Sequence, residues 1–222
     1  MGVLELSTVA EGVVTLTLNR PEKRNALSIE LRDAVSDALD QVAVDEQVRV
    51  AVITGAGDVF SAGFDLSEFQ VADQDFQKRL WASSDRFHRT CLTFPLPLVA
   101  AVNGPALAGG FDLAVMCDIR VATDTAVFSH PEQAWSDVVY SPLHDLVGGA
   151  VARDLCMTGR TITADEARRL NVVSRVVPPA DLPAAVAEVT GAIARAPRAN
   201  LLRTKAKALA RARVSAGATL DL

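Results

Sequence analysis

The stretch PLVAAVNGPALAGGFDLAVMCDIRVAT, residues 97–123, decides the fold of this chain. It opens with an apolar run at 98–102, passes through a glycine-containing segment, and continues into the apolar segment 111–117 and another short run at 119–122. A short continuous apolar run is consistent with a fully buried strand, and the glycines that follow it mark a turn. We therefore predict a buried strand, a tight turn, a short buried helix and a second strand.

The same alternation of strands and helices continues on both sides of this stretch. The predicted elements are a hairpin of strands at 3–9 and 13–18, a helix that Ser28 caps, a strand at 49–54, a helix at 76–91, a strand at 126–129, helices from about 142 onward and one strand at 172–177. Such alternation is typical of an α/β layer structure. We predict one core domain at 1–180, followed by a helical C-terminal region at 181–222.

Composition excludes several classes of protein. The chain has 222 residues, 22% of them charged, and a formal net charge of -5, which is ordinary for a globular protein and unlike a disordered one. The basic tract at 195–213 suits the solvated face of a helix better than a nucleic-acid surface. The three cysteines and three histidines show no disulfide or zinc spacing, so we predict no metal. Without an apolar leader or membrane span, a cytoplasmic protein is expected.

Two glycine-containing loops each follow a predicted strand. They are Ser61–Leu66 and Asn103–Gly110. Glycine allows a ligand to approach the backbone closely, and two N–H groups that converge on one point can form an oxyanion hole. Each loop taken alone is also consistent with an ordinary tight turn between a strand and a helix.

Two acids follow the second loop. Asp112 interrupts the apolar segment FDLAVMC, and Glu132 follows Pro131 after the predicted strand at 126–129. A buried acid needs a partner or a function, and two carboxylates beside an oxyanion hole can position a water and move a proton. The alternative is a salt-bridged core acid and a solvated loop acid. For His130, packing is favoured over contact with a ligand.

Five segments in order resemble the enoyl-CoA hydratase/isomerase (crotonase) superfamily: NRPEKRNAL, VFSAGFDL, the stretch at 97–123, FSHPE and LCMTGRTITADEARRLNVVSRVVP. The resemblance covers about residues 13–180. It implies the crotonase fold, a spiral of ββα turns with a helical C-terminal region that builds a homotrimer or a dimer of trimers. It also implies an acyl-CoA thioester as ligand and an enzyme of fatty acid metabolism. Coenzyme A would be part of the substrate, with no separate cofactor.

The resemblance also assigns roles to residues. Backbone N–H groups of Phe64 and Gly109 would hold the thioester oxygen. The residues that would contact CoA or substrate are Arg24, Ala26, Ala62, Asp65 and Leu66. Asp112 and Glu132 have the 20-residue separation of the two family glutamates. In a family hydratase these carboxylates hold a water over the 2,3 double bond of an enoyl-CoA. One takes a proton from the water and the other delivers one to C2.

Three departures keep the activity open. The first acid is Asp, as in dienoyl-CoA isomerases, but Tyr140 stands where those enzymes have a further Asp. The segment 136–148 is shorter than the family's proline- and glycine-rich turn, so the contribution of Trp135 and Tyr140 to a pocket is only an expectation. The C-terminal helices are expected to be abbreviated. Hydration is the leading prediction, and the alternatives are an enoyl- or dienoyl-CoA isomerase and a non-catalytic acyl-CoA-binding member.

Assembly is predicted from one further pattern. The apolar residues of the segment after 181 follow a stripe, and we expect a neighbouring subunit to bury it. These residues are Leu182, Val186, Val189 and Ile193.

Overall fold

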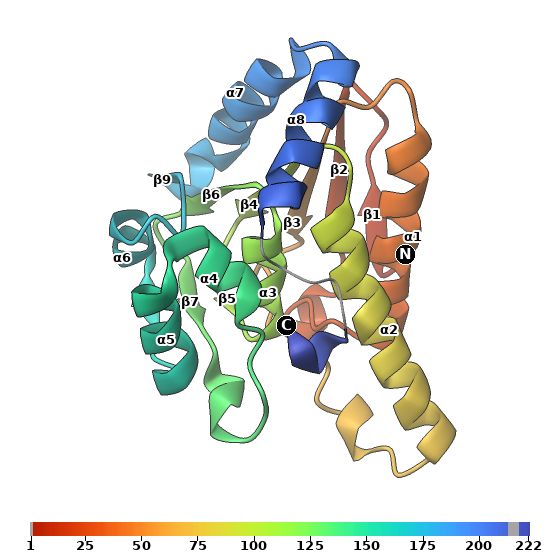
Figure 1. The fold of residues 1–222 in the computed structure, drawn as a ribbon, viewed down its shortest axis with the longest axis vertical. Helices are drawn as coiled ribbons and strands as arrows, with labels where there is room; N and C mark the ends of the chain where they lie inside the picture. The colour runs from red at the N-terminus through yellow and green to blue at the C-terminus, as the bar shows by residue number, and fades with distance from the viewer. Residues whose placement is uncertain (1, 213–217) are drawn as a thin grey trace.

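A mostly parallel sheet forms the centre of the molecule (Figure 1). The computed structural model describes residues 2–212 and 218–222. The six strands, in their order across the sheet, are β1 (Leu4–Leu6), β2 (Val13–Leu18), β3 (Val50–Gly55), β4 (Leu98–Val102), β6 (Ile119–Thr123) and β9 (Arg175–Val177). Only β1 and β2 are antiparallel, and they form the hairpin expected from the sequence.

A second, smaller sheet and the helices complete the fold. The small sheet contains β5 (Ala106–Leu107), β7 (Val127–Ser129) and β8 (Ile162–Thr163). The α-helices are α1 (Ile29–Val44), α2 (Gln74–Thr93), α3 (Gly109–Met116), α4 (Ser141–Val147), α5 (Gly149–Thr158), α6 (Ala164–Arg169), α7 (Leu182–Ala194) and α8 (Arg198–Arg211). The short 3-10 helices are η1 (Pro21–Lys23), η2 (Glu68–Gln70), η3 (Pro131–Ala134), η4 (Pro179–Asp181) and η5 (Thr219–Asp221).

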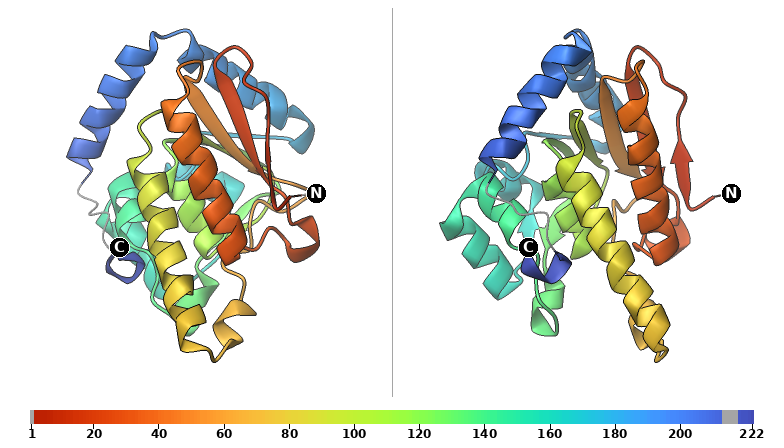
Figure 2. Two further views of the ribbon diagram at one scale, coloured as in Figure 1. Left: turned by 90° about the vertical axis from the view of Figure 1, so that its right-hand side faces the viewer. Right: turned by 45° about the vertical axis from the view of Figure 1, so that its right-hand side comes forward.

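Helices cover both faces of the main sheet, which explains its continuous apolar strands. Successive side chains of a strand point to opposite faces. In β3, Val50 and Val52 therefore pack in one cluster with α7, while Ala51 and Ile53 join the larger core with α1, α2 and α3. Both views of Figure 2 show α1 and α2 running side by side over that second face.

The prediction for the first helix is confirmed in detail. Ser28 caps α1, where its hydroxyl accepts a hydrogen bond from the Leu31 N–H at 3.3 Å. The strand predicted at 172–177 is shorter than expected, because only Arg175–Val177 pairs with β6. Val172 and Val173 are instead buried in the turn before it.

The apolar stripe of α7 packs partly on its own chain. Leu182 is buried against the main sheet, and Val186, Val189 and Ile193 are half-buried against the same cluster. Burial of their remaining exposed surface by a neighbouring subunit stays a prediction. The predicted boundary at residue 180 and the oligomeric state stay predictions.

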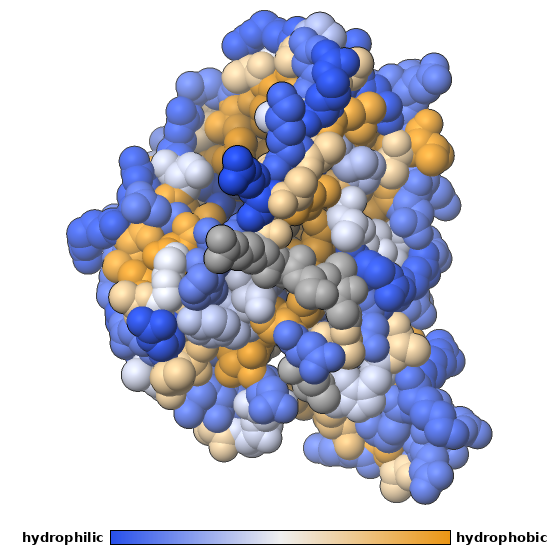
Figure 3. Space-filling view, in the orientation of Figure 1, coloured by the Kyte–Doolittle hydropathy of each residue, from blue (hydrophilic) through white to orange (hydrophobic). Residues whose placement is uncertain are grey.

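The basic C-terminal tract forms α8, as expected, although Arg213 lies outside the described residues. Lys205 anchors this helix, because its ammonium group pairs with Asp118 at 2.6 Å. Figure 3 shows hydrophilic residues along α8 with apolar side chains on either side of it. Within the described part of the chain, no helix has the length and apolar character needed to cross a bilayer.

Candidate functional site

The two glycine-containing loops meet at the ends of β3 and β4. The N–H of Leu107 donates to the carbonyl of Ser61 at 3.0 Å, and this hydrogen bond joins the two loops. Gly63 has a φ of +88°, and a Cβ placed on it would lie 2.7 Å from the Cβ of Ala108 and 3.1 Å from the Gly109 nitrogen. A side chain at Gly63 would therefore collide with the start of α3, which explains why glycine is needed there.

The meeting point presents two unused backbone donors. The N–H groups of Phe64 and Gly109 donate to no acceptor among the described residues. Ala108 directs the second donor: it holds a left-handed φ of 50°, and its own N–H is bonded to the Ser129 carbonyl at 2.9 Å. A free N–H in a loop and another at the start of a helix can together bind a carbonyl oxygen that gains negative charge.

The residues expected to contact CoA lie along the edge of this meeting point. The N–H of Ala62 donates to the carbonyl of Arg24 at 3.0 Å, which places the NRPEKRNAL loop beside the first donor. Arg24 and Leu66 are exposed, and Ala26 is half-buried. The structure thus brings these residues to one side of the two N–H groups.

Asp65 has a partner that the sequence interpretation missed. Its carboxylate pairs with Arg20 at 3.0 Å, and Arg20 also donates to the Ala26 carbonyl at 2.6 Å. Burial opposes charge on Asp65, but hydrogen bonds from Ser67 and Arg20 lower its pKa below the usual value. This ion pair ties the two loops together. Arg20 belongs to the NRP motif, and this position was the only sequence feature that could have indicated a role for Arg20 beside the first loop.

The two acids come together as predicted, with a third residue between them. Asp112 lies in the first turn of α3 and is buried, and Glu132 lies in η3. The Nδ1 atom of His130 is 2.9 Å from Glu132 Oε1 and 3.8 Å from Asp112 Oδ1. Ligand atoms of all three residues lie within 4.8 Å of one another. The groups are therefore close enough to share a proton or a water.

Burial shifts the proton affinities in this cluster. Burial raises the pKa of Asp112 to about 7; the charge of His130 opposes that rise and the charge of Glu132 adds to it. Burial also opposes charge on His130, but contact with Cys156, the hydrogen bond to Glu132 and both carboxylate charges raise its pKa to about 10. A histidine ligates a metal only as the neutral ring, so this proton competes with any cation.

Three polar atoms of the cluster remain available. Asp112 Oδ1, Glu132 Oε2 and His130 Nε2 are buried and have no hydrogen-bond partner among the described residues. A buried polar group without a partner costs free energy unless a water or ligand satisfies it. A water or another small polar molecule could satisfy these three atoms.

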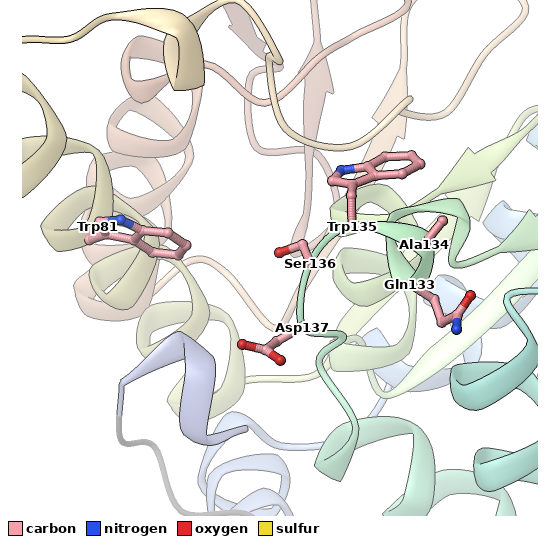
Figure 4. Close-up of a pocket in the computed structure, with 6 residues that line it drawn as sticks. All are labelled: Trp81, Gln133, Ala134, Trp135, Ser136 and Asp137. Carbon is pink, nitrogen blue, oxygen red and sulfur yellow. The ribbon is translucent and has the colours of Figure 1, made fainter.

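A pocket of about 490 Å³ lies next to η3. Its lining residues are Trp81, Gln133, Ala134, Trp135, Ser136 and Asp137. Figure 4 shows the side chains of Trp81, Ser136 and Asp137 pointing toward one another across the pocket. An aromatic series connects Trp81 through Phe69 to Phe64, with centroid separations of 6.1 and 6.3 Å. This series links one wall of the pocket to the residue that carries the first donor.

Of the two residues expected in the pocket, the structure places one there. Trp135 lines the pocket and is 63% exposed, whereas Tyr140 packs on the core and beside His144. The backbone N–H of Tyr140 donates to the carbonyl of Leu222, the residue that follows η5. Trp81, which the sequence left open as packing or pocket wall, lines the pocket from α2.

A sheet of this order, with two glycine-containing loops meeting at its strand ends and helices on both faces, is typical of a crotonase-fold protein. A family model described as enoyl-CoA hydratase/isomerase matches residues 8–220, and the chain belongs to that family. A probable enoyl-CoA hydratase of Mycobacterium leprae, echA6, is 39% identical over 83% of this chain and 75% of its own.

Solved structures agree with this assignment. An enoyl-CoA hydratase of Mycobacterium smegmatis superposes with a TM-score of 0.88 at 32% identity, over 97% of this chain and 85% of that one. A candidate enoyl-CoA hydratase of Thermobifida fusca was solved in complex with CoA. It superposes with a TM-score of 0.85 at 34% identity, over 96% of this chain and 87% of that one. The predicted crotonase fold is thus confirmed.

Proposed function

We propose that this protein is an enoyl-CoA hydratase, which adds water across the 2,3 double bond of an enoyl-CoA thioester. The observation that carries the proposal is that two carboxylates lie in one cluster: the buried Asp112, in the helix whose first residue bears a free N–H, and the half-buried Glu132 of η3. Hydration needs a group that activates a water, a group that supplies a proton and donors that stabilise an enolate.

In the proposed complex the N–H groups of Phe64 and Gly109 hold the thioester oxygen. The CoA portion lies along the exposed side of the loops, where Arg24 can pair with a phosphate and Ala26, Ala62, Asp65 and Leu66 contact the remainder. The substrate brings the CoA group itself, so the reaction needs no separate cofactor and no metal. Support for this placement comes from the free donors and from the exposed guanidinium beside them.

The acids divide the proton transfers. One carboxylate takes a proton from the bound water as its oxygen attacks C3, and the electron pair of the double bond moves toward the thioester oxygen. The two N–H donors stabilise the resulting enolate. The other acid then delivers a proton to C2. Each positioned acid or base contributes about 10² to 10⁴ in rate.

A double-bond isomerase is the second candidate. Two observations favour it: the first acid is Asp, one methylene shorter than Glu, and burial raises its pKa to about 7, which favours the protonated carboxyl more than in an ordinary aspartate. In that reaction Glu132 would move a proton between two carbons and Asp112 would only assist. Isomerisation needs one mobile proton and no bound water.

A substrate screen separates these activities. Purified protein is incubated with crotonyl-CoA, longer 2-enoyl-CoAs and 3-enoyl-CoAs while the absorbance of the conjugated thioester is followed. A loss of absorbance from 2-enoyl substrates supports hydration, and a gain from 3-enoyl substrates supports isomerisation. Calorimetric binding without turnover indicates a non-catalytic acyl-CoA-binding protein, and equal affinity for crotonyl-CoA and crotonate contradicts the thioester site.

We also propose a cytoplasmic homotrimer or dimer of trimers. The support for this assembly is membership of the family. The stripe of α7 is not counted as support, because it already packs partly on its own chain. Light scattering at micromolar concentration measures the assembly directly, and a monomeric mass contradicts it.

A further inference from the structure

His130 is enclosed by the candidate site without being part of the acid pair. Its side chain is fully buried, and its ring lies 4.8 Å from the ring of Phe111, at an interplanar angle of 33°. The backbone on either side is also fixed, since the neighbouring Ser129 carbonyl accepts the N–H of Ala108. The ring therefore has one orientation, with Nδ1 toward the two carboxylates.

The charged groups around this ring are both carboxyl groups. Asp112 approaches from α3 and Glu132 from η3, and the side chain of Cys156 contacts the ring from α5. Two carboxylates in a buried site repel each other, and this repulsion disfavours the ionised form of both. A cation placed between them reduces the repulsion, and a hydrogen bond from it fixes the direction of a carboxylate.

We propose that His130 is a positioning residue of the acid pair, whose imidazolium donates from Nδ1 to Glu132, faces Asp112, and holds both carboxyl groups ready for proton transfer. This role rests on the proposed function of the two acids. The bond occupies Oε1 of Glu132 and leaves Oε2, which has no partner among the described residues, to face a water or substrate. The imidazolium thereby sets both the geometry and the ionisation of the pair.

The first test measures the charge of the His130 ring by NMR and does not depend on enzymatic activity. The chain has three histidines, so the imidazole NMR signals are few, and His130→Phe identifies one by its disappearance. We expect the His130 signal of the ligand-free protein to stay that of an imidazolium through pH 8. A signal that titrates near pH 6.5, or a neutral ring at pH 7, overturns the proposal. A lack of enoyl-CoA activity would refute the proposed function and leave this measurement intact.

The second test separates positioning from packing. His130→Phe keeps a ring without nitrogen, and His130→Asn places an uncharged N–H donor near the position of Nδ1. We expect His130→Phe to lower kcat by about 10- to 100-fold with little change in KM, since proton transfer and not binding is affected. Loss of the cation should also move the acidic limb of the pH–kcat profile to higher pH, because the carboxyl groups then ionise less readily.

The matched comparisons decide the outcome. His130→Asn should recover part of kcat while its acidic limb stays at the shifted position. The exposed His144, on α4, provides the control, and His144→Phe should leave kcat and the profile unchanged. Wild-type kcat in His130→Phe, or a lowered kcat with an unshifted limb in both variants, would overturn the positioning role.

Discussion

Gly109 lies against the ring of Phe64 so closely that a methyl group at this glycine would be 2.8 Å from Phe64 Cδ1. The ring cannot retreat freely, because the guanidinium carbon of Arg32 lies 4.4 Å from its centroid on one side. The two proposed oxyanion donors thus belong to residues whose atoms are in direct contact. A change at either one moves the other.

Gly109→Ala is expected to damage catalysis more than folding. The added methyl group must push the Phe64 ring and shift one or both N–H groups away from the thioester oxygen. Loss of one such donor costs about 10²-fold in kcat. Steady-state kinetics with the active enoyl-CoA measures this, alongside a thermal melt.

Gly191→Ala is the matched control for that substitution. Gly191 lies in α7 with an ordinary helical backbone, and a Cβ there meets nothing within 4 Å. Alanine is favoured over glycine in a helix by about 1 kcal/mol, so this variant should melt slightly higher and keep full activity. Equal kinetics of the two variants would remove the argument for Gly109.

The acid substitutions discriminate the two candidate reactions. For a hydratase, Asp112→Asn and Glu132→Gln should each lower kcat by about 10²-fold or more, because an amide keeps the size of the side chain but does not exchange the proton. For an isomerase, Glu132→Gln should abolish turnover while Asp112→Asn keeps a substantial fraction. Steady-state kinetics with 2-enoyl and 3-enoyl substrates measures kcat of each variant for hydration and for isomerisation. Unchanged activity in both variants would exclude this pair.

The sequence was sufficient to predict features that depend on local pattern. The hairpin, the cap at Ser28 and the two glycine-containing loops follow from turn chemistry and apolar runs. The approach of Gly63 to Gly109 was predicted only through the family resemblance, since residues 46 positions apart carry no local signal of contact.

Features that depend on the direction of side chains were not predicted. Tyr140 was expected in the pocket, but its side chain packs on the core and beside His144, while Trp81 from α2 lines the pocket. His130 was interpreted as packing, because a single histidine beside a glutamate does not reveal a second carboxylate from another helix. The surroundings of these three side chains depend on how distant segments pack together, which the residue types alone do not reveal.

Arg32 should be a major contributor to the stability of the site. Its fully buried guanidinium donates to the carbonyls of Leu27 at 2.6 Å and Leu80 at 3.3 Å. Arg32→Met keeps much of the volume but leaves both carbonyls without this donor, at about 1–3 kcal/mol for each unsatisfied group. We expect the free energy of unfolding to fall by about 3 kcal/mol in urea titrations. Arg89→Met, at an exposed position of α2, should change it by less than about 0.5 kcal/mol.

The buried Asp112 should make stability depend on pH. Burial raises its folded-state pKa to about 7 from an ordinary value of 3.8. Between these two values the unfolded chain has released this proton and the folded protein still holds it, so the contribution of Asp112 to stability falls as pH rises from about 4 to 7. Asp112→Asn removes that dependence.

The test compares the melting temperatures of the two proteins at pH 5, 6, 7 and 8. His130 is present in both proteins, but Asp112 is one cause of its raised pKa, so the imidazole NMR titration of His130 is followed in Asp112→Asn to separate its contribution to the difference. The melting temperature of Asp112→Asn, relative to wild type, should rise steadily from pH 5 to pH 7 and level off above it. A difference that is constant across the series, or that declines with pH, would mean that Asp112 ionises normally in the folded protein, and that the buried carboxyl does not hold a proton at neutral pH.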